Sequence, residues 1–228
     1  MVYVILMGAQ GSGKGTQAAV IGPKLKLAKV ATGELFRTAI ADKTPLGMQV
    51  EEILARGELV PDDVTTEIVR ARLADIVAQS TDVMGEVQGA LFDGFPRNET
   101  QAESLDGILA ELGVAVTVVI EIDVPRAALI ERLAGRRTCV KSGRIVNIAT
   151  MSPQELAEID EPLIQRDDDH PDAVARRLEL YDEKTAPLLT YYAERGLLKR
   201  VNGDQPVDDV SEEIARAIGE RVQTDQVI

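Results

Sequence analysis

The sequence predicts an α/β fold in which helices cover both faces of a doubly wound, five-stranded parallel sheet. Short apolar runs alternate with longer stretches of helical period along most of the chain, which is typical of this class. The longest run, residues 114–122, is mainly apolar and β-branched, as expected of a parallel strand covered on both faces. A glycine-rich turn leads from the first run into the first helix. We expect strands at residues 2–7, 27–31, 90–93, 114–122 and 198–201.

Helices are expected between these strands. The first begins near Lys14 and should kink or stop at Gly22-Pro23, because a proline inside a helix removes a backbone hydrogen bond and clashes with the preceding turn. Pro61-Asp62 and Pro125 mark the starts of two later helices. The later helices are expected at residues 34–41, 46–56 (closed by Gly57), 62–79, 99–112, 125–137, 172–194 and 207–222, with a loop at residues 80–89.

Two segments interrupt the alternation of strands and helices. Residues 34–56 hold two short helices separated by Thr44-Pro45, and residues 138–165 lose clear period, with glycine and proline interspersed. A chain of 228 residues is long enough for one sizeable core but not for many domains. We therefore interpret both segments as small insertions into one main unit, and the second as mobile.

Composition narrows the classes of function. Hydrophobic residues at 45% and charged residues at 28% are typical of a globular protein, and no apolar run approaches the roughly 20 residues that span a bilayer. The formal net charge of −13 argues against a nucleic-acid-binding surface, which needs a broad basic face. The first residues lack the features of a secretory signal, so we expect a cytoplasmic protein without a membrane partner.

The chain has one cysteine, Cys139, and one histidine, His170. A single cysteine allows neither an intramolecular disulfide nor a cysteine zinc cage, so no zinc is expected. A serine or cysteine hydrolase triad would have to use His170, which follows three aspartates in what we interpret as a solvated helix entry.

The glycine-rich turn, GAQGSGKGT at residues 8–16, predicts a phosphate-binding loop. A strand that ends in such a turn and then opens a helix directs several backbone N–H groups at one spot, and Lys14 adds a positive charge for the outer phosphates. Gly15 follows the lysine where the strict pattern has serine or threonine, so Mg²⁺ should be held mostly by phosphates and water, with Thr16 as a further candidate. A dinucleotide fingerprint is excluded because Thr16 occupies its sixth position.

A second ligand is indicated by arginines beside turns and helix ends, where their side chains can converge on an anion. On the expected helix 125–137, Arg132 and Arg136 are four residues apart and should share a face. The alternative is that each arginine pairs with a surface carboxylate. The set comprises Arg37, Arg97, Arg132, Arg136, Arg166 and Arg177.

Asp93 ends a predicted strand next to the phosphate loop. A carboxylate at that edge of the sheet can hold Mg²⁺ through water. The alternative role is to cap the turn that begins at Gly94.

Six motifs, which follow one another over nearly the whole chain, resemble those of adenylate kinases. This resemblance implies a P-loop NTPase-like fold and reversible phosphoryl transfer from Mg-ATP to AMP, giving two ADP. It also implies a monomer with ATP, AMP and ADP as its partners. The motifs are residues 8–17, 32–37, 57–62, 92–97 with Gln101, 135–137 and 185–187.

The resemblance also implies boundaries and residue roles. The core would comprise residues 1–31, 61–136 and 170–228, with a mobile NMP-binding insertion at 32–60 and a mobile LID insertion at 137–169. The Gln101 amide can both donate to and accept from an adenine edge, unless it is simply exposed on its helix. Catalysis would fall to Lys14, Arg97, Arg132, Arg136, Arg166 and Arg177; ATP binding to Gly11, Ser12, Gly13, Lys14, Gly15, Thr16, Arg132, Arg136 and Gln205; and AMP binding to Thr32, Arg37, Glu58, Val60, Gly94, Arg97, Gln101, Arg166 and Arg177.

Several positions depart from the family pattern. Where relatives with a long lid carry an aromatic residue followed by histidine, this chain has Ile145-Val146-Asn147. Gln10 stands in place of a usual proline, and Gln205 in place of a frequent lysine. A lid without zinc could be held by a polar network, for which the candidates are Ser142, Arg144, Asn147 and Asp160. Asp168 and Asp169 could either pair with arginines or favour the start of the following helix through its dipole.

Three other functions are compatible with parts of this pattern. Another monophosphate kinase, acting on UMP, CMP or GMP, would keep the same loop, and Gln101 and Thr32 favour AMP over these. A catalytically weakened relative would bind nucleotides without turnover. A GTPase switch would need a guanine-reading Asn-Lys-x-Asp, which is not found, and an Asp-x-x-Gly after the second motif, which Asp93-Gly94-Phe95-Pro96 does not supply.

Overall fold

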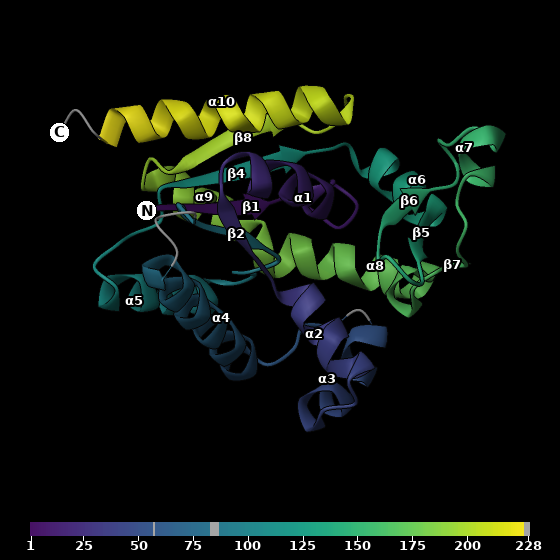
Figure 1. Ribbon diagram of the computed structural model, residues 1–228, viewed down its shortest axis with the longest axis horizontal. Coiled ribbons are helices and arrows are strands. Elements are labelled where there is room, and N and C mark those ends of the chain that lie inside the picture. Colours follow the sequence, from purple (N-terminus) through teal and green to yellow (C-terminus); the bar gives the residue numbers. More distant parts are fainter. Residues whose placement is uncertain (57, 83–86, 226–228) are drawn as a thin grey trace.

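The computed structural model describes residues 1–56, 58–82 and 87–225. Its centre is a five-stranded sheet in which all neighbouring strands are parallel, in the order β2-β3-β1-β4-β8 (Figure 1). The five predicted strands and their parallel arrangement are confirmed. The strands are β1 (Val2–Met7), β2 (Leu27–Ala31), β3 (Gly89–Asp93), β4 (Val118–Asp123) and β8 (Leu198–Asn202).

β4 begins four residues later than the apolar run predicted. Its pairing with β1 starts at Val118, opposite Val4. Just before that point the backbone N–H of Tyr3 donates to the Thr117 hydroxyl, at 3.0 Å, and not to a carbonyl of the next strand. The Thr117 hydroxyl therefore takes the place of one backbone acceptor, while the Thr117 N–H still donates to the Tyr3 carbonyl, at 2.9 Å.

Helices pack on both faces of the sheet, as predicted for a doubly wound fold. Alternate residues of β1 belong to two separate apolar clusters: Tyr3, Ile5 and Met7 face one, and Val4 and Leu6 face the other. Figure 1 shows α10 on one side of the sheet and α4 and α5 on the other. The helices of this part of the chain are α1 (Lys14–Lys24), α4 (Asp62–Asp82), α5 (Glu99–Glu111), α6 (Arg126–Gly135), α8 (Pro171–Leu180), α9 (Pro187–Glu194) and α10 (Val207–Asp225).

Proline determines how two of these helices end or break. α1 continues one residue past Pro23, so the predicted stop at this position is confirmed within a residue. The helix predicted over residues 172–194 is instead two helices joined by a π-helical turn, Tyr181–Thr185. Pro187 has no N–H to donate, and the preceding Ala186 N–H reaches back to the Tyr181 carbonyl, at 2.8 Å.

The helix predicted over residues 125–137 ends earlier, at Gly135, and Arg136 is the first residue of strand β5. A Cβ on Gly135 would lie 2.1 Å from the Asn147 side-chain oxygen, so the chain turns here where only glycine fits. The Gly135 carbonyl accepts from Ile148 N–H, at 2.9 Å. The expectation that Arg132 and Arg136 share one helical face is therefore wrong.

The first insertion consists of α2 (Thr32–Ala41) and α3 (Pro45–Ala55). α2 begins two residues before its predicted start, directly after β2. These helices enclose a small apolar cluster of Phe36, Val50 and Val60, which is separate from those on the sheet. Gly57, expected to close the second helix, lies outside the described residues, as does part of the loop predicted at 80–89.

The second insertion contains a small antiparallel sheet in the order β6-β5-β7. Its strands are too short to give a periodic pattern in the sequence, which explains why residues 138–165 show none. The elements are β5 (Arg136–Cys139), β6 (Ile145–Asn147), α7 (Pro153–Ala157), β7 (Leu163–Ile164) and a 3₁₀ turn, Asp167–Asp169.

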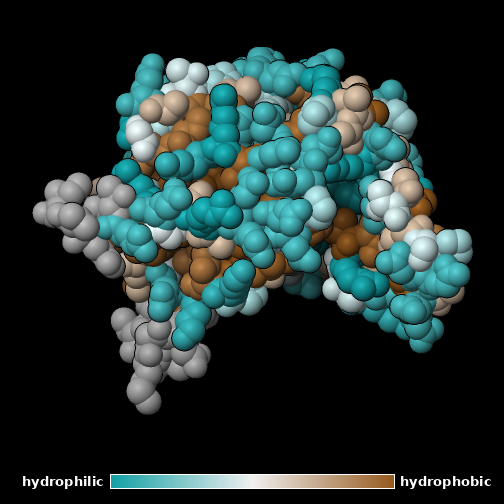
Figure 2. All heavy atoms as spheres, turned by 90° about the horizontal axis from the view of Figure 1, so that it is seen from above, coloured by the Kyte–Doolittle hydropathy of each residue, from teal (hydrophilic) through white to brown (hydrophobic). Residues whose placement is uncertain are grey.

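The surface is largely hydrophilic on the face that Figure 2 shows. On this face, seen from above, hydrophobic side chains lie in small separate patches. Among the described residues, no helix has the length and apolar character needed to cross a membrane.

Candidate active site

The phosphate loop lies between the carboxyl end of β1 and the amino end of α1. Gly8 adopts a φ of +140°, and a Cβ there would lie 2.7 Å from the Ile122 carbonyl oxygen of β4. Gly13, with a φ of +99°, precedes α1, whose first turn has no side-chain cap. The free N–H groups at the start of α1 can therefore meet an anion.

Two side chains of the loop add polar hydrogens. The Lys14 ammonium donates to the carbonyl oxygens of Gly8, at 2.7 Å, and Ala9, at 2.9 Å. The buried hydroxyl of Ser12 has no hydrogen-bond partner among the described residues, so it keeps a donor for a ligand.

Burial lowers the pKa of Lys14 to about 8. The Asp93 carboxylate opposes this shift, while Arg97, Arg136 and Arg177 reinforce it through repulsion. The negative charge of a bound phosphate would stabilise the protonated form of Lys14, which burial disfavours.

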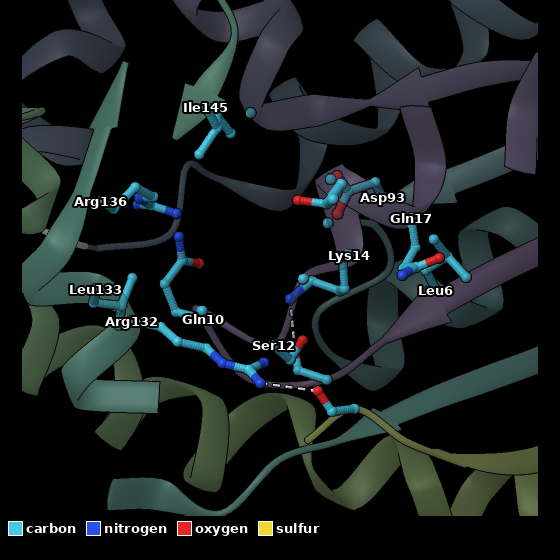
Figure 3. Close-up of a pocket in the computed structure, with 18 of the residues that line it drawn as sticks. Leu6, Gln10, Ser12, Lys14, Gln17, Asp93, Arg132, Leu133, Arg136 and Ile145 are labelled. Carbon is cyan, nitrogen blue, oxygen red and sulfur yellow. Dashed lines mark hydrogen bonds between the residues drawn. The ribbon is translucent and has the colours of Figure 1, made fainter. Parts of the chain in front are cut away.

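The loop forms one wall of a cavity of about 550 Å³. Figure 3 shows Gln10 extending into this cavity from the loop, with Arg132 and Arg136 nearby and Lys14 and Asp93 across from them. Every residue that the resemblance assigned to ATP lines this cavity: Gly11, Ser12, Gly13, Lys14, Gly15, Thr16, Arg132, Arg136 and Gln205.

A second cavity, of about 400 Å³, lies between the first insertion and the segment after β3. Thr32 Oγ1 donates to the Gly94 carbonyl, at 2.9 Å, and Arg97 Nε donates to the same oxygen, at 2.8 Å. Every residue assigned to AMP lines this second cavity: Thr32, Arg37, Glu58, Val60, Gly94, Arg97, Gln101, Arg166 and Arg177.

The two cavities share a wall of four arginines: Arg37, Arg97, Arg166 and Arg177. Burial and the neighbouring arginines lower the pKa of Arg97 and of Arg166 to about 10. Positive charges are thus crowded where the cavities meet, which favours anionic groups from both sides.

The acidic pair after the second insertion balances part of this charge. Arg136 Nε donates to Asp169 Oδ2, at 2.8 Å, and Arg177 is ion-paired with Asp168. The Asp169 side chain is fully buried. Both aspartates therefore pair with arginines, although they also precede α8 and keep the favourable position near its amino end.

Two further arginines of the set, Arg166 and Arg132, are positioned by hydrogen bonds to the second insertion and to the core, respectively. Arg166 Nε donates to Thr138 Oγ1, at 2.8 Å, and Arg132 donates to the Gly203 carbonyl, at 3.1 Å, and to Asp204. The alternative was that each of the six arginines pairs with a separate carboxylate on the surface. Three of them do pair with a carboxylate, but all six line a cavity.

Asp93 suits a metal that keeps most of its water and phosphate ligands. It ends β3, lines the first cavity and lies close to Gly15, where a Cβ would come within 3.4 Å of its Oδ2. The exposed Thr16 lines the same cavity. Within the described ranges there is no group of three or more side chains that could hold a metal unaided. One carboxylate beside a phosphate loop fits Mg²⁺ bound chiefly through its nucleotide.

The hydrogen bonds within the second insertion involve three of the four polar residues that were predicted to hold it together. The hydroxyl and N–H of Ser142 donate to Glu161, at 2.6 and 3.0 Å, and Arg144 N–H donates to the Ser142 hydroxyl, at 3.3 Å. Asn147 Nδ2 donates to the Arg132 carbonyl, at 3.4 Å, and Asn147 Oδ1 accepts from the Ala149 N–H, at 2.9 Å. Asp160 makes no hydrogen bond within the part of the chain that the structure describes. The prediction for Asp160 is wrong by one residue, because the carboxylate that faces the loop between β5 and β6 belongs to Glu161.

Some residues of the site escaped prediction. Gln10 was only a departure from a pattern, yet its side chain lies in the first cavity (Figure 3). Asp62, on α4, accepts a hydrogen bond from the side-chain amide of Gln101, on α5, at 2.6 Å. The Thr185 hydroxyl donates to the Arg97 carbonyl, at 2.8 Å. Gln10 is the one long side chain of the loop before Lys14, and this could have identified it. Asp62 and Thr185 lie within two of the six motifs, residues 57–62 and 185–187, but their contacts join distant segments, and the sequence alone does not indicate them.

Comparison with known proteins agrees with this geometry. The family model described as adenylate kinase matches residues 6–197. The adenylate kinase of Symbiobacterium thermophilum is 43% identical over 220 residues, which cover 95% of this chain and 98% of that protein. The adenylate kinase of Oceanobacillus iheyensis is 44% identical over 215 residues, covering 92% and 96%. That of Moorella thermoacetica is 42% identical over 219 residues, covering 95% and 97%. These matches confirm the family predicted from the motifs, and the chain belongs to the adenylate kinase family of phosphotransferases.

Proposed function

We propose that this chain transfers a phosphoryl group reversibly from Mg-ATP to AMP, giving two ADP, with ATP in the first cavity and AMP in the second. The observation that carries this proposal is the wall of arginines shared by two nucleotide-sized cavities. Phosphoryl transfer needs two phosphate chains brought end to end with their charge neutralised, and such a wall supplies this arrangement.

In the forward reaction an oxygen of the AMP phosphate attacks the γ-phosphorus of ATP. A new P–O bond forms as the bond from the γ-phosphorus to the bridging oxygen breaks, and both products are ADP. Lys14 and the loop N–H groups hold the phosphates of ATP, and the shared arginines neutralise charge on the transferred group. No side chain needs to act as a nucleophile.

The remaining assignments belong to the same proposal. Bound Mg²⁺ would shield the phosphates of ATP, and Asp93, with Thr16 nearby, would hold it largely through water. Residues 32–60 and 137–169 would close over AMP and ATP as separate mobile units, which excludes water and prevents hydrolysis of ATP. We also propose that the protein is a cytoplasmic monomer that binds neither zinc nor nucleic acid.

A coupled assay of ATP with each of AMP, GMP, CMP and UMP tests the proposed reaction. We expect AMP to give the highest kcat/KM. A clear preference for UMP, CMP or GMP would reassign the substrate, and tight nucleotide binding with turnover near background would show a weakened relative.

A further inference from the structure

We propose that Asp62 sets the base specificity of the second cavity by fixing the orientation of the Gln101 side-chain amide. The cavity would then accept a 6-aminopurine monophosphate and reject a 6-oxopurine one. This inference rests on the proposed function, which places the nucleoside monophosphate in this cavity.

Gln101 is buried, with 1% of its surface exposed, and lines the second cavity. Its Nε2 donates to Asp62 Oδ1, at 2.6 Å, and its Oε1 accepts from the backbone N–H of Arg97, at 2.8 Å. Both ends of the amide are therefore engaged inside the protein.

The two partners of Gln101 admit only one orientation. A carboxylate oxygen accepts and cannot donate, whereas a backbone N–H donates and cannot accept. A flipped amide would place its oxygen against the Asp62 carboxylate and its NH₂ group against the Arg97 N–H. Both hydrogen bonds would be lost at a buried site, which is strongly unfavourable.

The fixed amide retains one N–H hydrogen and one oxygen lone pair for a ligand. Adenine offers an acceptor at N1 and a donor at its 6-amino group, whereas hypoxanthine and guanine offer a donor at N1 and an acceptor at O6. A freely rotating amide could match either order. An amide held from behind matches one of them, which fits the adenine edge proposed for this cavity.

Asp62 is itself held in place. It is the first residue of α4, and its Oδ1 also accepts from Asn98 Nδ2, at 2.9 Å. Asn98 in turn caps α5 by accepting from the Gln101 N–H, at 2.9 Å. The carboxylate that orients the amide is thus part of a rigid junction between two helices of the core.

The ordinary role of Asp62 would be to stabilise the amino end of α4. The neighbouring Asp63 lies in the same first turn, is exposed and makes no side-chain contact with Gln101 within the described structure. Asp63→Ala removes the same charge from the same helix turn and therefore serves as the matched control.

The test compares AMP with IMP, which differs from AMP by the oxo group and the N1 hydrogen. We would measure kcat/KM in the presence of Mg-ATP, and binding of AMP and IMP by calorimetry, for the wild type and three variants. The wild type should favour AMP by about a hundredfold or more. Asp62→Ala should reduce that ratio about tenfold, Asp62→Asn should keep most of it because its oxygen still accepts, and Asp63→Ala should leave it unchanged.

A second variant tests the orientation directly. In Gln101→Glu the carboxylate can only accept, so it pairs equally well with the 6-amino group of AMP and with the N1 hydrogen of IMP, and it opposes the one acceptor that each base places beside that donor. This variant should therefore lose most of the preference for AMP over IMP. An equal loss for AMP and IMP in Asp62→Ala, with the ratio unchanged, would overturn the inference and leave Asp62 a purely structural residue. A wild type that neither phosphorylates nor binds AMP would instead overturn the proposed function and this inference with it.

Discussion

The guanidinium of Arg136 and the carboxylate of Asp169 join the two ends of the second insertion. Arg136 Nε donates to Asp169 Oδ2, at 2.8 Å, and the Asp169 side chain is fully buried while that of Arg136 is 13% exposed. Arg136 opens β5 and Asp169 ends the 3₁₀ turn before α8, so the pair closes the insertion at its base.

Replacement of Asp169 by alanine should lower the free energy of unfolding by about 3 kcal/mol, because it leaves the largely buried Arg136 charge without its partner. Urea denaturation would measure the loss. Asp167→Ala, at an exposed position of the same turn, should change it by less than about 0.5 kcal/mol. Equal effects of the two substitutions would show that the Arg136 pair contributes little to stability.

Lys14→Ala should reduce kcat by roughly a hundredfold to a thousandfold, because the ammonium stabilises charge on the phosphates during transfer. The variant loses the hydrogen bonds from Lys14 to the Gly8 and Ala9 carbonyls. The loop should still keep its shape, because the backbone bonds from Ser12 N–H to Ala9 and from Gln17 N–H to Gly13 remain, at 3.1 and 2.9 Å. Circular dichroism and thermal melting would check the fold, with Lys24→Ala at the exposed end of α1 as the control. A variant that loses its fold along with its activity would contradict the assigned role.

The pH dependence should report the lowered pKa of Lys14. The protonated lysine binds phosphate, and its protonated fraction falls as the pH rises through about 8, so kcat/KM for ATP should fall above pH 8. Bound phosphates raise the pKa of the lysine, and kcat should therefore fall only at higher pH. Lys14→Arg stays charged throughout this range and should lack the fall near pH 8.

Arg97→Ala should weaken the binding of AMP more than the binding of ATP. Arg97 reaches the Gly94 carbonyl beside Thr32, on the AMP side of the shared wall, and loss of a charge-assisted contact should raise the KM for AMP about tenfold to a hundredfold. The KM for ATP should change by less than about threefold. Initial-rate measurements with each nucleotide varied in turn would decide, and equal losses for both would contradict this placement.

Asp93→Asn should raise the Mg²⁺ concentration needed for half-maximal activity by about tenfold, since an amide binds a hydrated cation more weakly than a carboxylate. A magnesium titration at saturating ATP would measure the change. Asp123→Asn, exposed at the corresponding end of β4 in the same sheet, is the control and should leave the requirement unchanged. An unaltered titration for Asp93→Asn would support the turn-capping role at Gly94 instead.

The sequence predicted those features that local patterns record. Apolar runs located the strands, and the glycine-rich loop located the first cavity. The bend at Gly135 could not be predicted, because it depends on contact with Asn147, which comes from a different strand. The break between α8 and α9 follows from Pro187, whose effect was masked by apolar spacing that continues across it.

The candidate site shows the same division. Every residue that the motifs suggested lines one of the two cavities. The partners that hold those residues, such as Thr138 for Arg166 and Asp62 for Gln101, come from distant segments. Such pairings are a product of tertiary structure. Thr138 lies outside the six motifs, and the motif that contains Asp62 does not indicate that it meets Gln101.

The common boundary of the two cavities constrains how this enzyme can change. Its four arginines line both cavities and face the phosphates, so selectivity for the base has to evolve at the outer ends, where Gln101 lines only the second cavity and Gln10 only the first. Recognition of the base is thereby separated in space from the transfer step, and new monophosphate preferences can arise while the catalytic centre stays intact.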